Sequence, residues 1–87
     1  MTTPKDQLAR SPNQVGDAVR RRRRTLRLTQ ATLGERTSLR QATISAIESG
    51  AAATQLRTLF DILAALDLEL VIRPRSRTSS TTLEDNF

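Results

Sequence analysis

The sequence predicts a small all-α domain of four or five short helices, followed by one C-terminal β-strand. Between residues 12 and 66 the apolar residues recur every three or four positions, which is the period of amphipathic helices. From residue 68 to residue 73 the apolar Leu68, Leu70 and Ile72 alternate with Glu69, Val71 and Arg73, which is the period of a strand. With 87 residues and 37% hydrophobic content, the chain can form only one small core, so a partner subunit would add stability.

The composition divides the chain into three segments. Residues 1–11 are polar and are expected to be flexible, residues 12–73 hold the periodic apolar pattern, and residues 74–87 are expected to form a flexible tail. That tail begins with proline and is rich in serine and threonine, PRSRTSSTTLEDNF.

The missing residue types narrow the function. The chain has no cysteine and no histidine, so disulfides, the usual zinc sites and the common Ser-His and Cys-His nucleophile pairs are excluded. We therefore expect no enzyme, no metal and no cofactor. The sequence lacks the apolar core of a signal peptide and any apolar run near 20 residues. We expect a cytoplasmic protein that does not enter a membrane.

The charge distribution indicates a polyanion partner. Residues 1–50 have a net charge of +6 and residues 51–87 a net charge of −1, and thirteen of the fourteen basic residues are arginine. Charge alone does not separate DNA from RNA or an anionic membrane. The chain has only two aromatic residues, Phe60 and Phe87, so the stacking platforms typical of single-strand binding are missing.

The first helix is expected to begin after Ser11, which can act as its cap, with Pro12 in the first turn, and to run to about Arg27. Four apolar residues give it an inner stripe: Val15, Ala18, Val19 and Leu26. Arg22 and Arg23 interrupt that stripe. Arg22 can lay its aliphatic stem on the core with its head in water, whereas Arg23 requires another explanation.

The next two helices are predicted to form a helix-turn-helix. Thr29 can cap the first of them, and Gly34 would let the following helix approach closely. Residues 37–39 form the predicted turn, in which Ser38 stands where glycine would more easily take a positive φ. The following helix, about Arg40 to Ser49, buries Ile44 and Ile47 and ends at Gly50.

The fourth helix is expected to begin after a Thr54 cap. One face consists of Leu56, Leu59, Phe60 and Leu63, and Ile62 and Leu66 make it wider than one small core requires. A lone strand at residues 68–73 would leave its backbone groups unpaired, so we predict that two copies of the chain pair this strand in a homodimer. The residues expected in the dimer interface are Ile62, Leu66, Leu68, Leu70, Val71 and Ile72.

These residues resemble a known family. The combination of Gly16, Val19, Arg20 and Arg23 with LTQ at 28–30, Leu33-Gly34, TIS at 43–45 and IESG at 47–50 is similar to the helix-turn-helix of the phage-repressor-like (XRE/Cro) regulators, whose fold is lambda-repressor-like. Within that family the chain most resembles the HipB-type antitoxins. The features that carry this closer resemblance are QATIS at 41–45, Leu59-Phe60, Ile62-Leu63 and the LDLELVI segment.

The resemblance assigns roles to particular residues. It implies an ion pair between Arg23 and Glu48, although Arg23 can also be one of a solvated run of arginines. It implies that Gln30 binds a DNA phosphate with help from Thr43 and Ser49. Arg20 and Arg24 lie four apart on one helix face and are further candidates for phosphate contacts.

The start of the third helix carries side chains suited to reading bases. Arg40 can donate two hydrogen bonds to guanine, Gln41 can pair with adenine, and Ala42 can contact a thymine methyl group. Ser45 lies one turn further on and can contact a base or a phosphate.

The resemblance also implies a function and partners. HipB-type antitoxins bind palindromic operator DNA as homodimers in the bacterial cytoplasm, in association with the nucleoid, repress their own operon, and neutralise a HipA-like serine/threonine kinase toxin. The alternative is a stand-alone XRE-family or phage-like repressor without a toxin. Phe87 is a candidate toxin contact, although it can equally be a proteolysis mark or a terminal residue without a role.

Overall fold

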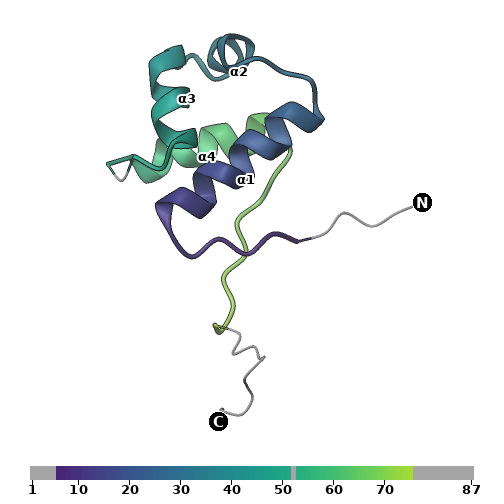
Figure 1. Cartoon of the computed structure of the whole chain (residues 1–87), viewed down its shortest axis with the longest axis vertical. Helices are drawn as coiled ribbons and strands as arrows, with labels where there is room; N and C mark the ends of the chain where they lie inside the picture. The colour runs from purple at the N-terminus through teal and green to yellow at the C-terminus, as the bar shows by residue number, and fades with distance from the viewer. Residues whose placement is uncertain (1–5, 52, 76–87) are drawn as a thin grey trace, which may run out of the picture.

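The computed structural model describes residues 6–51 and 53–75, and this part of the chain forms four helices. They are α1 (Pro12–Thr25), α2 (Gln30–Thr37), α3 (Gln41–Glu48) and α4 (Leu56–Ala65). Helix α1 packs on α3, and α2 packs on both α3 and α4 (Figure 1). The all-helical domain and its helix-turn-helix are therefore confirmed.

Two of the helices begin at the caps expected from the sequence. The Ser11 hydroxyl accepts a hydrogen bond from the Gln14 backbone N–H at 3.2 Å, and the Thr29 hydroxyl accepts one from the Thr32 N–H at 3.0 Å. Helix α4 starts differently, because Gln55 is its N-cap and no side chain caps it. The prediction of a Thr54 cap is wrong: the chain enters the helix one residue later.

All four helices end in the same way, with a residue in the left-handed region followed by a backbone hydrogen bond that spans five residues. The left-handed residues are Arg27, Ser38, Gly50 and Asp67, with φ values of 58°, 59°, 90° and 57°. The closing bonds run from Leu28 N to Arg23 O, Leu39 N to Gly34 O, Ala51 N to Ala46 O and Leu68 N to Leu63 O, at 2.8 to 3.0 Å. This is the Schellman motif, and three of its four closing residues are leucines that pack against the core.

The core lies between the four helices and contains six buried apolar side chains: Val19, Leu33, Ile44, Ile47, Ile62 and Leu66. Val15, Leu28, Leu39, Ala65 and Leu68 are partly buried against it. Leu26 was expected in the inner stripe of α1 but is exposed. The helix ends at Thr25 and Arg27 is left-handed, so the helical period that pointed Leu26 inward no longer applies.

The structure corrects the expected interface on α4. Ile62 and Leu66 are 0% exposed, so they have no surface left to give to a second copy of the chain, and their assignment to the dimer interface is wrong. Apolar residues occupy more than one side of α4, and the side that carries Ile62 and Leu66 meets the core. The large apolar side chains that α4 leaves exposed are Leu56 and Phe60.

Two glycines permit close contacts between helices. An ideal Cβ at Gly16 in α1 would lie 2.3 Å from the carbonyl oxygen of Ile47, at the end of α3. A Cβ at Gly34 would lie 2.7 Å from the carbonyl oxygen of Leu39. Because real Cβ atoms essentially never come this near to backbone oxygens, both positions require glycine if α3 is to keep its place.

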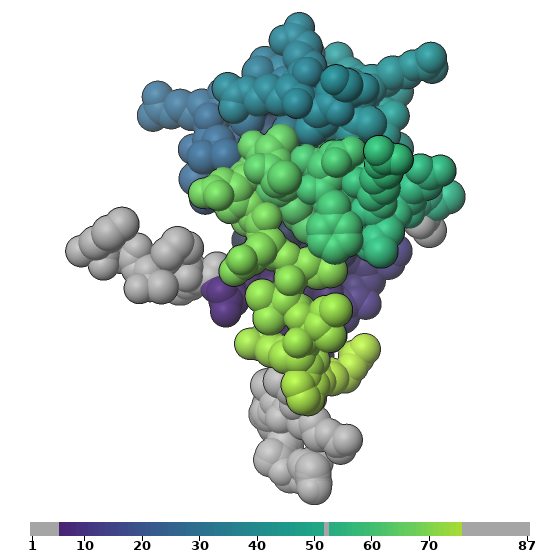
Figure 2. Space-filling view, turned by 180° about the vertical axis from the view of Figure 1, so that it is seen from behind, coloured from purple at the N-terminus to yellow at the C-terminus, as the bar shows by residue number. Residues whose placement is uncertain are grey.

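Residues 68–75 leave the helical body as an extension without regular secondary structure (Figure 1). From behind, this segment continues along the same side of the molecule as α4 (Figure 2). Leu70, Val71 and Ile72 are exposed, and Ile72 is 90% exposed. The strand expected here needs a second chain for its hydrogen bonds and stays a prediction. Among the described residues, no helix has the length and apolar character needed to cross a bilayer.

Candidate nucleic-acid interface

Helix α3 separates a buried face from a polar, exposed face. Ile44, Ile47 and Glu48 are buried, and the first two belong to the core. The opposite face exposes Gln41, Ala42, Ser45 and Ala46, and Arg40 is exposed at the N-cap. The four predicted base-reading residues, Arg40, Gln41, Ala42 and Ser45, therefore all lie at the surface of one short helix.

The turn between α2 and α3 holds this helix in place. Ser38 adopts the left-handed conformation, which a glycine would take more easily, and Leu39 packs partly against the core. The Thr37 hydroxyl donates hydrogen bonds to the carbonyl oxygens of Leu33 and Gly34, at 2.8 and 3.2 Å. The end of α2 is thus well bonded, and the close approach at Gly34 brings α3 directly onto it.

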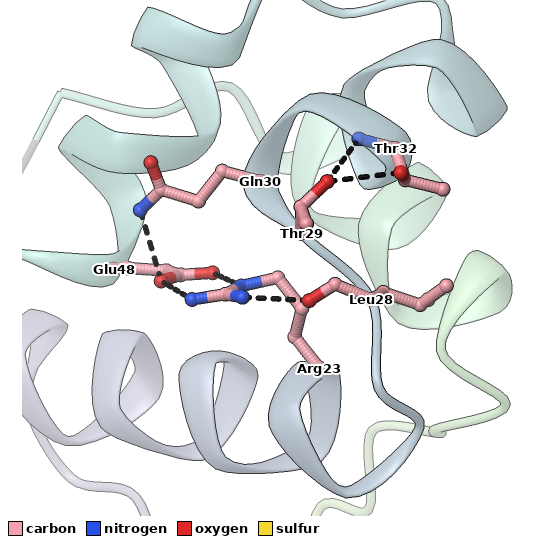
Figure 3. Close-up of polar contacts among 6 residues, drawn as sticks. All are labelled: Arg23, Leu28, Thr29, Gln30, Thr32 and Glu48. Atoms are coloured by element: carbon pink, nitrogen blue, oxygen red, sulfur yellow. Dashed lines mark hydrogen bonds and ion pairs between the residues drawn. The ribbon is translucent and has the colours of Figure 1, made fainter.

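A buried ion pair joins α1 to the end of α3 (Figure 3). Arg23 Nε donates to Glu48 Oε2 at 2.6 Å, and Arg23 Nη2 donates to Glu48 Oε1 at 3.0 Å, so the pair is bidentate. The remaining Arg23 nitrogen, Nη1, donates to the carbonyl oxygen of Leu28 at 2.7 Å. One guanidinium therefore ties together α1, the α1–α2 connection and α3.

The surroundings of Arg23 keep it charged. Hydrogen bonding to Glu48 raises the pKa of Arg23 above its ordinary value, burial opposes that rise, and the charge of the Glu48 carboxylate adds to it. The Arg23 side chain is only 10% exposed and that of Glu48 only 3%. Both charges are therefore nearly removed from water and depend on each other for compensation.

Gln30 extends this network to the start of α2. Its Nε2 donates to Glu48 Oε1 at 3.2 Å, as Figure 3 shows. An amide NH₂ has two hydrogens, so one bond to Glu48 leaves the second hydrogen available for another acceptor. Gln30 is the first residue of α2, where backbone N–H groups and the helix dipole favour an anion.

The five consecutive arginines of α1 have different surroundings. Arg20 and Arg21 both pair with Asp17, at 2.8 and 2.9 Å. Arg22 donates to the carbonyl oxygen of Leu66 at 2.9 Å, at the C-terminus of α4. Arg23 is buried, and Arg24 is exposed without a side-chain partner among residues 6–51 and 53–75.

The remaining predicted site residues lie apart from this network. Thr43 is half-buried in α3, and the exposed Ser49 donates its hydroxyl to the carbonyl oxygen of Ala46 at 2.9 Å. Phe87 lies outside the described residues.

Sequence reasoning missed Asp17 as the shared acceptor of two arginines, and Arg22 as a cap of α4. The ion pairs of Asp17 could have been predicted from the sequence, because an aspartate three or four positions before an arginine on a helix commonly pairs with it. The bond from Arg22 to the Leu66 carbonyl oxygen joins residues 44 positions apart, and no sequence pattern indicated it.

Comparison with known proteins places the chain in a class and then in a family. A family model described as helix-turn-helix matches residues 19–72. The chain is therefore a helix-turn-helix DNA-binding regulator, and it belongs to the XRE-type helix-turn-helix family. No protein with curated annotation matches the sequence.

Solved structures of HipB are similar to this chain over most of its length. One is HipB in a complex with a 20mer named O2, which is 33% identical with a TM-score of 0.77, covering 83% of this chain and 100% of that one. Another is a HipA–HipB–O2–O3 complex, at 32% identity and a TM-score of 0.75, covering 82% and 100%. A third, HipB with a 20mer named O4, has 32% identity and a TM-score of 0.76, covering 82% and 100%.

Proposed function

We propose that this protein is a sequence-specific transcriptional repressor that serves as the antitoxin of a toxin–antitoxin module. In this role it represses its own operon and binds and neutralises a HipA-like serine/threonine kinase. The observation that carries the DNA-binding part is α3, whose apolar side lies in the core while Gln41, Ala42 and Ser45 are exposed. The likeness to HipB in a complex with HipA supports the antitoxin part.

On DNA, α3 enters the major groove and its exposed residues contact base edges. Arg40 binds guanine, Gln41 binds adenine, and Ala42 and Ser45 contact neighbouring bases. Each good bidentate contact discriminates against a wrong base by about 1 to 3 kcal/mol.

Phosphate contacts set the register of the helix on the duplex. Gln30 uses its second amide hydrogen and the N-terminus of α2 to bind one phosphate, with Thr43 and Ser49 contributing from α3. Arg24 is available for a neighbouring phosphate. Arg20 reaches one by exchanging its bond with Asp17, a half-buried ion pair near the surface of the kind that contributes under about 1 kcal/mol.

The protein binds a palindromic operator as a homodimer in the bacterial cytoplasm. The exposed Leu70, Val71 and Ile72, together with Leu68, form an interface in which the two C-terminal segments pair as strands. Ile62 and Leu66 do not contact the second copy; they belong to the core on which the interface segment rests.

A Gln41→Ala variant tests base reading. We expect weaker binding to the chain's own promoter, about 10-fold to 100-fold, with little change on random duplex DNA, measured by fluorescence anisotropy at fixed salt. Gln55→Ala is the matched control, since Gln55 is exposed and its side chain makes no capping bond. Equal losses on both DNAs would show that Gln41 does not read a base.

The antitoxin role requires a separate experiment. We expect the chain to co-purify with a HipA-type kinase encoded beside it and to suppress that kinase's activity. Repeating the experiment without residues 76–87 tests the proposed contact by Phe87. Specific promoter binding without any adjacent kinase, or without inhibition of it, would support a stand-alone repressor instead.

A further inference from the structure

An apolar groove runs beside the C-terminal segment, on the side of α1 away from the base-reading helix. Three parts of the chain line it: the N-terminal segment 6–10, the two helices α1 and α4, and residues 67–75. Its apolar walls include Leu8, Val15, Leu59, Leu63, Leu70 and Ile72. In the view of Figure 1 the N-terminal segment passes across the C-terminal segment below α1, and both segments line this groove.

The N-terminal segment 6–10, here called the strap, is bonded to α1. Gln7 Nε2 donates to Asp17 Oδ2 at 3.5 Å, and the Arg10 backbone N–H donates to the Gln14 side-chain oxygen. These two bonds hold the strap at the edge of the groove without closing it. Leu8 remains 51% exposed, although it lies between two bonded residues and lines the groove.

The occupant that fits this groove is a second copy of the same chain. Residues 68–73 form one wall of the groove, so a strand that pairs with them must lie in it or at its edge. In such a strand Leu68, Leu70 and Ile72 share one face, which meets the apolar walls, while Glu69 lies on the other face.

We propose that the strap is part of the dimer interface, with Leu8 packing against the C-terminal segment of the other copy. This inference rests on the strand-paired homodimer proposed above and adds a contact that strand pairing alone does not require. Two-fold symmetry repeats each contact, so both straps enclose the paired segments.

Sedimentation equilibrium of the full chain tests the proposal. Leu8→Asp is expected to raise the dimer dissociation constant about 100-fold, because every dimer carries the substitution twice. The control is Leu26→Asp, which changes another exposed leucine that does not line the groove and should leave the constant within about 3-fold of wild type. Circular dichroism should show equal helix content in all variants.

Two further measurements separate the strap from the strand. Leu70→Asp should give monomers. If this variant stays dimeric, both the strand pairing and the strap contact are refuted. If Leu70→Asp is monomeric but Leu8→Asp dimerises like wild type, only the strap contact is refuted. Because the chain has no cysteine, a mixture of Leu8→Cys and Leu70→Cys chains can be joined only between copies by a short bismaleimide. We expect cross-linked heterodimers of these two variants. In the control, a mixture of Leu26→Cys and Leu70→Cys chains should give no cross-linked heterodimers.

Discussion

Removing one partner of the buried ion pair is expected to destabilise the domain strongly. Replacing Arg23 by methionine keeps an unbranched side chain but deletes three hydrogen bonds, two to Glu48 and one to the Leu28 carbonyl oxygen. Glu48, 3% exposed, would keep only the amide of Gln30, at 3.2 Å. An uncompensated buried charge costs about 3 to 5 kcal/mol, which is a large share of the roughly 5 to 15 kcal/mol that typically stabilises a folded protein.

Urea unfolding followed by circular dichroism, at one fixed protein concentration, measures this loss. We expect Arg23→Met and Glu48→Met each to lower the free energy of unfolding by about 3 kcal/mol or more, and the melting temperature by at least about 12 °C. The double variant should lose at least about 2 kcal/mol less than the sum of the two single variants, because it leaves no charge behind. Single losses below about 1 kcal/mol, or losses that simply add, would refute the reasoning.

The pKa shift of Arg23 sets the pH range of this effect. Hydrogen bonding to Glu48 raises the pKa of Arg23 in the folded state, so the stability linked to Arg23 is fully present below the pKa that this residue has in the unfolded chain. It is lost only when the pH rises through the still higher folded value. The penalty of Arg23→Met should therefore be the same at about pH 7 and pH 10, and a smaller penalty at the higher pH would contradict the raised pKa.

Three other substitutions test separate features. Arg20→Ala should reduce the slope of log affinity against log salt by about 1 in a DNA titration, and an unchanged slope would exclude a phosphate contact. Arg27→Gly should raise the melting temperature by about 2 to 6 °C, because glycine takes the left-handed conformation without strain; a lower value would show that the arginine side chain stabilises that turn. Gly16→Ala should cost about 1 to 3 kcal/mol in urea unfolding, since its Cβ would collide with the Ile47 carbonyl oxygen; a neutral result would mean that α1 can move away.

The features that could be predicted from sequence depend on neighbouring residues. Ser11 and Thr29 cap their helices through residues three positions ahead, which the sequence displays directly. The pairing of Arg23 with Glu48 spans 25 positions and was accessible only through resemblance to a family. Nothing in the sequence marks Arg27 as left-handed, because arginine is not among the residues that favour that region, whereas Asp67 is of a type that occurs there more often.

The errors on α4 have a different cause. Ile62 and Leu66 were assigned to a partner because the helix carries more apolar residues than one face can hold. Which of these faces becomes the core is decided by how α2 packs on α4, and that packing involves residues distant in sequence. Periodicity identifies an amphipathic helix but does not choose between two apolar sides.

The two faces of α3 imply that the protein can change its target without losing its fold. Among the described residues, the side chains of Gln41, Ala42 and Ser45 are exposed and make no hydrogen bond within the chain, whereas Ile44, Ile47 and Glu48 carry the packing and the ion pair. On the proposed base-reading role, substitutions in the first set are expected to change the preferred bases at little cost in stability, whereas substitutions in the second set are expected to destabilise the fold. New operator preferences can therefore evolve, or be engineered, independently of the scaffold that presents them.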